Sequence, residues 1–371
     1  MNKNLYYIIA GEPSGDLHGA SLINEMKSLN SQISFKGLGG PLMQKAGLKT
    51  SINFQRLSVM GFWEVLKDIR FFLHLKKDIL KSISESKPKK IILIDYPGFN
   101  LSLAKSLKSI LDVPIIYYIS PQVWAWKENR VKIIKDCVDQ MLCIFPFEEN
   151  WFQQKGVKAK YVGHPFSQLE KANKNSRLEF YKKHQIDPSA KILALMPGSR
   201  QIEVNRHLKT MLESAKIICE KNNIVPVIGL APDISLPKIE NEFIKIEKEN
   251  PINVLKNSHV SILSSGTISL EAGLYEIPSI VIYKMNLISW FIAKSLVKVK
   301  YVSMTNILLE REIFKEYLQN EIDSKSIAEQ ILKFINNNKN ETLGYLKELK
   351  KIIGKKKPNI EAAKIILGTI N

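Results

Sequence analysis

Short apolar runs recur along the chain, and each stops at a polar or glycine-containing turn. The run IILI at 91–94 follows the basic stretch Lys87–Lys90 and ends at Asp95, which is typical of a strand buried on both faces of a parallel sheet. Comparable runs lie at Leu5–Ala10, Ile33–Phe35, Pro114–Ser120, Gln140–Phe145 and Ala159–Val162. Helical stretches such as Leu17–Leu29 separate them, so the first half of the chain predicts a βαβ alternation with a parallel sheet and right-handed crossovers.

The polar stretch Ser167–Ala190 contains no core-like strand and is interpreted as a linker with helical pieces. A second α/β unit follows it, with an amphipathic helix at Ile202–Lys221 and expected strands at Ile192–Met196, Ile224–Leu230, Val260–Leu263 and Ile280–Tyr283. From about Asp323 the chain is helical, lysine-rich and free of strands. The pattern predicts an α/β protein with two Rossmann-like parallel-sheet domains facing a cleft, and a helical C-terminus.

We place the first domain at residues 1–167 and the second at 168–344, with the C-terminal helix at about 345–371 as a candidate to complete the first. The 371 residues, 45% of them hydrophobic, agree with about two domains. The net charge of +18, from 54 Lys and Arg against 36 Asp and Glu, favours polyanionic partners such as nucleic acid, an anionic lipid surface or a phosphorylated ligand. Because Lys, Ile and Asn are abundant throughout, compositional bias without any partner is the alternative.

The cysteines Cys137, Cys143 and Cys219 have no zinc spacing and indicate a reduced, cytosolic protein. The N-terminal apolar run is too short for a signal-peptide core. The sequence also contains no stretch of about 18 uncharged apolar residues, so a spanning helix is not expected. Attachment to a membrane surface remains open.

Asp95 is expected at the carboxyl end of its strand. Ligands of open α/β sheets bind outside those ends, so a carboxylate there is well placed to act on one. Pro97 and Gly98 shape the following loop, and Asn100 is expected to cap the next helix. The alternative is that Asp95 only caps or braces this turn.

The turn GEPSGD follows the first expected strand. Gly11 and Gly15 allow close backbone approach, and Asp16 is expected to cap the helix that follows. A helix N-terminus at this place favours an anionic or polar ligand, with ordinary turn chemistry as the alternative.

Two turns in the second half each place small donors just before a helix. They are PGSR, with Gly198, Ser199 and Arg200, and SSGT, with Ser264, Ser265, Gly266 and Thr267. Backbone N–H groups, the helix dipole and a guanidinium together suit a diphosphate. Glu271, one turn into the second helix, suits hydrogen bonds to a ribose diol. Each turn alone agrees with simple capping, but the pair on successive βα units indicates a nucleoside diphosphate.

Several aromatic residues lie among cations or polar groups. The segment 59–75 contains Trp63, Phe71 and Phe72, and the segment 286–301 contains Trp290 and Phe291. We interpret both as segments that would press their rings into a lipid surface while their cations meet anionic head groups, and a buried core helix is the equal alternative for the first.

The loop PQVWAWKENR is interpreted as a ligand-contacting turn through Gln122, Trp124 and Trp126. The alternative is that its rings wall a domain interface. His164 in YVGHPF is expected to line the interdomain cleft or to order its own loop, and a purely structural histidine is the alternative.

A series of motifs occurs in the order AGEPSGD, GLGGPLM, MGFWEV, IDYPGFN, YYISPQVWAWKENR, FPFE, YVGHPF, LMPGSRQIEV, SSGTISLE and KYVSMTN. In order and spacing they resemble the lipid A disaccharide synthases, over about residues 5–310. The resemblance implies an inverting GT-B glycosyltransferase of the bacterial cytoplasm, peripheral to the inner membrane, in lipid A and lipopolysaccharide biosynthesis. It implies that UDP-2,3-diacylglucosamine and 2,3-diacylglucosamine 1-phosphate (lipid X) are condensed to the β-1,6-linked disaccharide 1-phosphate with release of UDP.

The same resemblance implies roles for individual residues. The N-terminal half would bind the acceptor through Gly15, Gln122, Trp124 and His164, with Asp95 as general base and Glu12 and Asp16 as alternative bases or positioning groups. The C-terminal half would bind the UDP-sugar through Gly198, Ser199, Arg200, Ser265, Gly266, Thr267, Glu271 and Asn306. An anionic membrane surface is an implied partner, nucleic acid is not, and a homodimer is open.

No metal or cofactor is expected. The sequence has no Asp-x-Asp motif, and His18, His164 and His207 are dispersed along it. Arg200 and the helix N-termini would then replace a divalent ion in a metal-independent transfer.

Three other functions compete with this interpretation. A UDP-sugar 2-epimerase or a peptidoglycan-type N-acetylglucosaminyltransferase would share the diphosphate turns but would need a different acceptor half. A non-enzymatic nucleic-acid-binding protein would explain the charge, but it predicts stacking aromatics and basic residues gathered on one surface.

Overall fold

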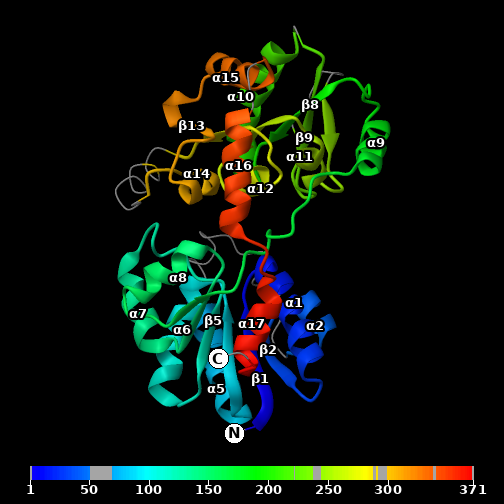
Figure 1. Cartoon of the computed structure of the whole chain (residues 1–371). Helices are drawn as coiled ribbons and strands as arrows, with labels where there is room; N and C mark the ends of the chain where they lie inside the picture. The colour runs from blue at the N-terminus through cyan, green and yellow to red at the C-terminus, as the bar shows by residue number, and fades with distance from the viewer. Residues whose placement is uncertain are drawn as a thin grey trace. The chain divides into compact units, whose positions relative to one another are not determined.

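The computed structural model describes residues 2–50, 69–220, 222–236, 244–286, 290, 299–336 and 340–369. They divide into two compact units. Unit 1 is Met1–Ser167 with Ile353–Asn371, and unit 2 is Gln168–Ile352. Figure 1 shows that each unit is built around its own sheet.

The described part of unit 1 contains a seven-stranded parallel sheet with the order β3-β2-β1-β4-β5-β6-β7. Its strands are β1 (Asn2–Ala10), β2 (Ser34–Leu38), β3 (Leu48–Lys49), β4 (Pro88–Ile94), β5 (Ile115–Tyr118), β6 (Gln140–Cys143) and β7 (Ala159–Tyr161). The order reverses between β1 and β4, where Ala10 pairs with Ile94. This is the topological switch point of a Rossmann sheet, the place at which ligands of such folds bind.

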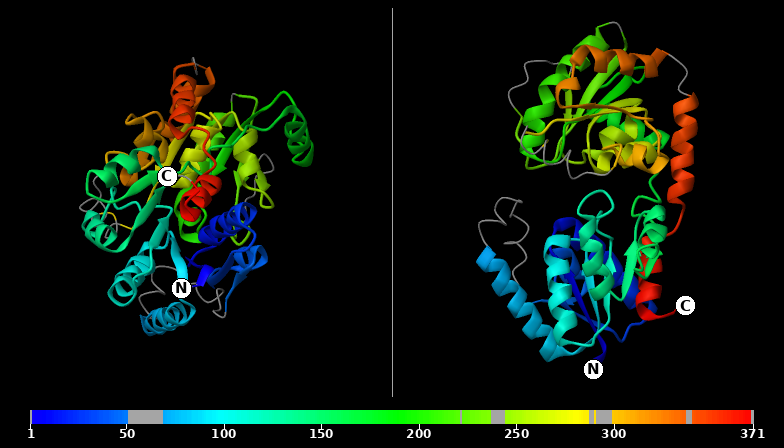
Figure 2. Two further views of the ribbon diagram at one scale, coloured as in Figure 1. Left: turned by 60° about the horizontal axis from the view of Figure 1, so that its bottom comes forward. Right: turned by 90° about the vertical axis from the view of Figure 1, so that its left-hand side faces the viewer.

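Alternating residues of the central strands supply two hydrophobic cores in unit 1, one on each face of the sheet. Tyr6 and Ile8 face the side covered by α1 (Pro13–Leu29), α2 (Pro41–Ala46) and α17 (Pro358–Leu367). Tyr7 and Ile9 face the side covered by α5 (Ile69–Ser86), α6 (Pro97–Ile110), α7 (Val131–Cys137) and α8 (Pro146–Gln153). A short 3-10 helix spans Glu128–Arg130. Figure 2 shows α5 and α17 on opposite sides of this sheet.

The last helix, α17, packs beside α1 although the two are far apart in the sequence (Figure 1). Ala362, Ala363 and Ile366 are fully buried in the core that α1 also lines. The hydroxyl of Tyr118 donates to Asn359 Oδ1 at 2.7 Å. The chain therefore returns to unit 1 after it has formed unit 2.

Unit 2 repeats the same plan, with a parallel order β10-β9-β8-β11-β12-β13 among its described residues. Its strands are β8 (Lys191–Met196), β9 (Ile224–Gly229), β10 (Lys245–Glu247), β11 (Val260–Ser264), β12 (Ser279–Tyr283) and β13 (Lys315–Leu318). The helices α10 (Gln201–Cys219) and α15 (Ser324–Asn336) pack on one face. The other face carries α9 (Lys174–Lys183), α11 (Ile252–Asn257), α12 (Thr267–Leu274) and α16 (Asn340–Ile353). Two shorter elements complete the unit, α14 (Met304–Leu309) and a 3-10 helix at Gln319–Glu321.

The central strands predicted from the apolar runs are confirmed in both units, but the edge strands β3, β10 and β13 were not predicted. Two helices also begin earlier than predicted, α1 at Pro13 and α6 at Pro97. Proline suits the first turn of a helix because the N–H it lacks would have no partner inside the helix. Over the part of the chain that is described, no helix has the length and apolar character that a membrane span needs.

Candidate active site

The turn after β4 holds Asp95 in an uncommon backbone conformation. Asp95 and Tyr96 both have positive φ angles, 44° and 50°, which non-glycine residues rarely adopt. The carbonyl oxygen of Asp95 accepts hydrogen bonds from Tyr117 Oη at 2.6 Å and from Asn100 Nδ2 at 2.7 Å. Asn100 is fully buried inside α6, so the prediction that it caps this helix is wrong. Its amide instead fixes the backbone from which the Asp95 side chain projects.

The carboxyl group of Asp95 is partly withdrawn from water beside a second carboxylate. Burial and, to a smaller extent, the nearby charge of Glu12 raise the pKa of Asp95 to about 6, and a backbone hydrogen bond from Tyr96 opposes them. Glu12 is exposed and follows β1 directly as the N-cap residue of α1. A side chain at Gly11 would collide with the ring of Tyr96, so glycine lets the turns after β1 and β4 meet. The switch point of unit 1 thus brings Glu12 and Asp95 together.

Two other residues of the GEPSGD turn have structural contacts. Asp16 is buried, and its carboxylate oxygens accept from the backbone N–H groups of Leu42 at 3.0 Å and Met43 at 2.9 Å. It therefore caps α2 and not its own helix, which corrects the prediction. Gly15 lies in the first turn of α1, where a side chain would press on Ala10 of β1.

The two tryptophans of the loop after β5 differ in their exposure to solvent. Trp124 is only 7% exposed and donates its Nε1–H to Glu148 at 2.9 Å, which leaves this side chain little surface for the predicted ligand contact. Trp126 is 42% exposed and Gln122 is exposed, so both stay available to a ligand. Tyr117, which holds the Asp95 carbonyl, could not be singled out within the apolar run PIIYYIS.

His164 orders its own loop. It is 4% exposed, and its Nδ1 accepts from the backbone N–H of Phe166 at 3.0 Å. Burial and the neighbouring His18 lower the pKa of His164 to about 3. The ring is therefore neutral at physiological pH, with its proton on Nε2.

The PGSR turn of unit 2 follows β8 at the corresponding switch point. Gly198 has φ 129°, and the side chains of Ser199 and Arg200 are exposed. The backbone N–H groups of Ser199 and Arg200 already donate to Glu203 Oε2, at 3.1 and 3.3 Å. The predicted use of these N–H groups for a diphosphate would therefore require Glu203 to move, whereas the Arg200 guanidinium needs no such change.

A buried histidine, His207, is hydrogen-bonded to the backbone of this turn. His207 Nδ1 lies 3.0 Å from the carbonyl oxygen of Pro197, and its Nε2 accepts from the backbone N–H of Lys284 at 3.0 Å. His207 is fully buried, and burial lowers its pKa. The neutral ring thus links the turns after β8 and β12.

The SSGT turn follows β11, the strand next to β8. Gly266 has φ 147°, Thr267 is exposed at the first position of α12, and Ser265 Oγ donates to the carbonyl oxygen of Val302 at 3.0 Å. Glu271 is half-buried in the same helix. Burial raises the pKa of Glu271 to about 7, and the charge of Lys256 opposes this effect.

Asn306 is held in a buried hydrogen-bond network of unit 2. It is fully buried, and its Nδ2 donates to Phe314 O at 2.7 Å and to Glu316 Oε1 at 2.8 Å. Its Oδ1 accepts from the backbone N–H groups of Ile313 and Phe314, both at 2.9 Å. Because the amide is fully used inside unit 2, the predicted contact with the sugar nucleotide would require some of these bonds to break.

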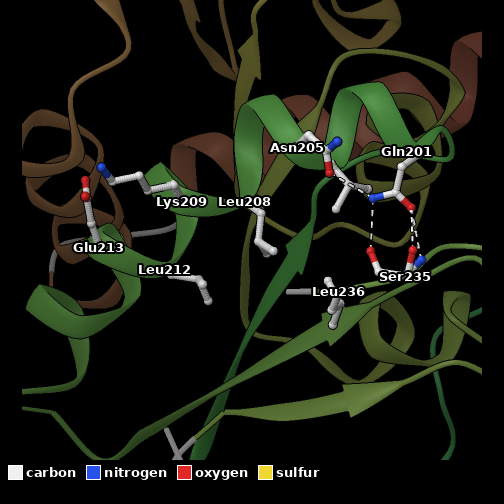
Figure 3. A pocket seen from close by; sticks show the side chains of 9 residues that line it. Gln201, Asn205, Leu208, Lys209, Leu212, Glu213, Ser235 and Leu236 are labelled. Atoms are coloured by element: carbon white, nitrogen blue, oxygen red, sulfur yellow. Dashed lines mark hydrogen bonds between the residues drawn. The ribbon is translucent and has the colours of Figure 1, made fainter. Parts of the chain in front are cut away.

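A cavity of about 610 Å³ lies along one side of α10 (Figure 3). Val204, Leu208, Leu212 and Leu236 give it an apolar floor. Near the start of α10, the Gln201 amide is bonded to Ser235 in both directions, at 3.0 Å to its carbonyl oxygen and 3.0 Å from its N–H (Figure 3). The residues predicted to bind the UDP-sugar do not line this cavity.

The predicted membrane residues are only partly described, because Trp63 and Phe291 lie outside the described residues. Phe71 and Phe72 are half-buried and pack against the unit 1 core, with the Phe72 ring 6.1 Å from that of Phe99. Trp290 is half-buried. Among the residues that the structure describes, no three His, Cys, Asp or Glu side chains gather in a way that would hold a metal ion.

Sequence comparison relates almost the whole chain to one enzyme family. The profile of the family described as Lipid-A-disaccharide synthetase matches residues 6–366. A Lipid-A-disaccharide synthase of Myxococcus xanthus is 38% identical over 332 residues, which cover 87% of this chain and 86% of the relative. One of Coxiella burnetii (strain Dugway 5J108-111) is 35% identical over 341 residues, which cover 91% of this chain and 90% of the relative.

Solved structures share the fold at low sequence identity. The glycotransferase of kitacinnamycin covers the whole of both chains with a TM-score of 0.67 and 10% identity. A putative UDP-N-acetylglucosamine 2-epimerase from Listeria monocytogenes covers 99% of this chain and 95% of its own, with a TM-score of 0.63 and 10% identity. The chain has the α/β fold of GT-B glycosyltransferases, two Rossmann-like units with a helical C-terminus, as predicted. The fold alone does not separate transferases from epimerases, whereas the sequence family does.

Proposed function

The chain belongs to the lipid-A-disaccharide synthetase family, glycosyltransferases that make the lipid A disaccharide, and from this premise we propose how its two units share the reaction. Unit 1 binds diacylglucosamine 1-phosphate, and unit 2 binds UDP-diacylglucosamine. The transfer inverts the anomeric carbon, forms the β-1,6 bond and releases UDP. The observation that carries the assignment is the position of Asp95 at the switch point of unit 1.

Asp95 is the general base. A pKa of about 6 keeps this carboxylate ionised at neutral pH while leaving it basic enough to accept a proton. Asp16 is a weaker candidate because both of its oxygens already cap α2. Glu12 remains the alternative base, since it is exposed beside Asp95.

In the chemical step, the Asp95 carboxylate takes the proton of the acceptor 6-hydroxyl. The freed oxygen forms a bond to the anomeric carbon of the donor sugar, and the bond from that carbon to the diphosphate breaks. The electron pair leaves with UDP. The Arg200 guanidinium and the N-termini of α10 and α12 offset the added charge.

Unit 2 anchors the UDP moiety through exposed groups. Arg200 and Ser199 contact the diphosphate from the PGSR turn, and Thr267 with the Gly266 backbone contacts it from the SSGT turn. Glu271 holds the ribose diol, which it can do as an acceptor when ionised and as a donor when protonated. The exposure of Ser199, Arg200 and Thr267 supports this arrangement.

A turnover assay on the purified protein tests the proposal. The lipid pair is supplied with chelator, and disaccharide 1-phosphate and UDP are measured. Product under chelation supports both the reaction and its independence of metal. UDP release or an epimer from UDP-N-acetylglucosamine, without product from the lipid pair, would move the function to another UDP-sugar enzyme of the same fold.

We further propose that the enzyme works at an anionic membrane surface. The substrates are lipids, the chain carries a net charge of +18, and Leu73 on α5 is 61% exposed beside the half-buried Phe72. Leu73→Ser should weaken co-sedimentation with phosphatidylglycerol vesicles. Leu178→Ser is the matched control, because Leu178 is an exposed leucine on α9 of unit 2. Equal binding of the two variants would contradict the part assigned to α5.

A further inference from the structure

The FPFE motif ends in Glu148, a charged residue for which the reaction has no direct use. Its side chain is fully buried in the first turn of α8, the helix that follows β6. The carboxylate accepts hydrogen bonds from Ser120 Oγ at 2.6 Å, Trp124 Nε1 at 2.9 Å and the Phe145 backbone N–H at 3.1 Å. Glu148 therefore ties the loop after β5 to the turn after β6.

A buried carboxylate is costly unless its oxygens are fully hydrogen-bonded. Burial raises the pKa of Glu148 to about 7, and the bonds from Ser120 and Trp124 oppose this effect. These two donors lie 28 and 24 residues before Glu148 in the sequence. The group thus stabilises the placement of a distant loop, a task that capping α8 alone would not require.

The loop that Glu148 holds begins next to the proposed base. The backbone N–H of Asp95 donates to the carbonyl oxygen of Tyr118 at 3.1 Å. The next residue, Ile119, has φ 66°, a conformation that is unfavourable for a β-branched side chain. Such strain persists only where the surroundings impose it. Here the N–H of Ile119 donates to Leu142 O at 3.1 Å, and Ser120 is held by Glu148.

A row of aromatic rings extends this brace across neighbouring strand ends. The rings of Trp124 and Phe147 lie edge to face at 4.9 Å, and those of Phe145 and His164 are 4.9 Å apart. The turns after β5, β6 and β7 therefore form one packed layer. Within this layer, the loop after β5 is hydrogen-bonded to the buried carboxylate of Glu148.

We propose that Glu148 is a positioning residue for the acceptor. Its carboxylate fixes the 120–126 loop, and that loop presents the exposed Gln122 and Trp126 at the edge of the sheet where Asp95 lies. Glu148 itself touches no substrate, because its side chain is fully buried. The inference rests on the proposed binding of the acceptor by unit 1.

The test combines steady-state kinetics with UDP-binding calorimetry. Glu148→Gln keeps the shape but turns one acceptor oxygen into a donor that faces other donors. It should raise the acceptor KM about tenfold and lower kcat several-fold, while the Kd of UDP stays within twofold of the wild type. Trp124→Phe removes one donor, keeps an aromatic ring and should change the acceptor KM in the same direction by a smaller factor.

Glu247→Gln is the matched control. Glu247 is also a buried carboxylate, with its contacts in unit 2, where it accepts from Lys183 at 2.8 Å and from the backbone N–H of Glu249 at 2.8 Å. It should lower the thermal midpoint without changing the acceptor KM.

Three results would count against the inference. One is an acceptor KM within twofold of the wild type in Glu148→Gln, and another is an equal loss of kcat at constant KM in Glu148→Gln and Glu247→Gln. If Glu148→Gln does not fold, unchanged acceptor kinetics in both Trp124→Phe and Ser120→Ala would overturn it. Failure of the wild type to form the disaccharide would instead refute the proposed function, before any variant is compared.

Discussion

The two sheets have the same strand order around their switch points, but the turns at their carboxyl edges have different backbone conformations. In unit 1, the turns after β4 and β5 place positive φ angles on Asp95 and Ile119, at 44° and 66°. In unit 2, the turns after β8 and β11 place them on Gly198 and Gly266, at 129° and 147°. Among these four turns, the strained ones belong to unit 1 and the unstrained glycine turns to unit 2, although Gly163 of unit 1 and Gln319 of unit 2 also have positive φ angles.

This difference agrees with two different roles, the positioning of a side chain and the binding of a ligand. A non-glycine residue in a left-handed conformation costs about 1–3 kcal/mol, and the folded protein retains it where the position of one side chain matters. A glycine turn costs little and leaves backbone and exposed donors for a ligand that brings its own charge. We infer that unit 1 positions a reacting group of the protein, whereas unit 2 anchors an anionic ligand.

Replacing Asp95 by Asn should have the largest effect on turnover. Loss of the general base should lower kcat by about 10²–10⁴-fold, while UDP binding to unit 2 stays unchanged. In the wild type, kcat/KM should fall as the pH drops below about 6, because protonation of Asp95 removes the base. The pH profile and UDP calorimetry check both statements, and near-normal turnover would transfer the role to Glu12.

The same substitution should stabilise the protein at neutral pH. The folded-state pKa of Asp95, about 6, lies above its ordinary value of 3.8, so the folded state binds the proton more tightly. Protonated Asp95 makes its full contribution to the free energy of unfolding below a pH of about 4, and this contribution is lost as the pH rises to about 6. Asp95→Asn should therefore raise the free energy of unfolding by about 1–3 kcal/mol at pH 7.5, and the gap should close near pH 4. Denaturant titrations at the two pH values measure it, and a destabilised variant would mean that the low activity reflects damage to the fold.

Asn306→Ala should have the next largest effect, on stability. Unit 2 also contains a buried polar network, in which the amide of Asn306 is bonded to Phe314 and Glu316. Removing it leaves several buried donors and acceptors unpaired, which should cost about 2–4 kcal/mol of unfolding free energy. Urea unfolding measures this loss. A fully stable variant with weakened UDP binding would restore Asn306 as a ligand contact.

Arg200→Ala should mainly affect the donor substrate. A charge-assisted contact to a diphosphate is worth about 1.5–3 kcal/mol, so the Kd of UDP should rise about tenfold to a hundredfold. The thermal midpoint should not change, because Arg200 is exposed. Lys209→Ala, an exposed cation further along the same segment, is the control. Equal weakening by both variants would indicate a general charge effect.

The central strands could be predicted because both of their faces are buried. β4 and β8 consist largely of apolar residues, with Ile91–Ile94 completely buried. The edge strands β10 (Lys245–Glu247) and β13 (Lys315–Leu318) are short and begin with charged residues, and so their sequences resemble loops. Their pairing depends on a neighbouring strand that no local pattern reveals.

The switch-point residues could be predicted as a set, but the partners of the polar ones could not. The apolar runs locate Asp95 and Arg200 at strand ends. Asp16, however, bonds to backbone groups 26 and 27 residues later, and Glu148 bonds to side chains more than twenty residues earlier. Only the folded chain brings these groups together. This is why Asp16 was assigned to the wrong helix and Glu148 received no role.

Glu203→Gln should have the smallest effect, and it tests most directly how the glycine turn of unit 2 receives its ligand. Glu203 Oε2 accepts from the N–H groups of Ser199 and Arg200, so a carboxylate of the protein occupies the position proposed for part of the diphosphate. Glutamine keeps an oxygen for these bonds but removes the negative charge. One repulsive charge at contact distance in water is worth about 1 kcal/mol, so UDP should bind about fivefold tighter. Glu213→Gln on the exposed side of α10 is the control and should leave the Kd unchanged. Weaker binding by Glu203→Gln would mean that the carboxylate orders the Arg200 turn for its ligand. An acidic side chain would then pre-organise a turn of unit 2, in the same manner as Glu148 is proposed to fix a loop of unit 1.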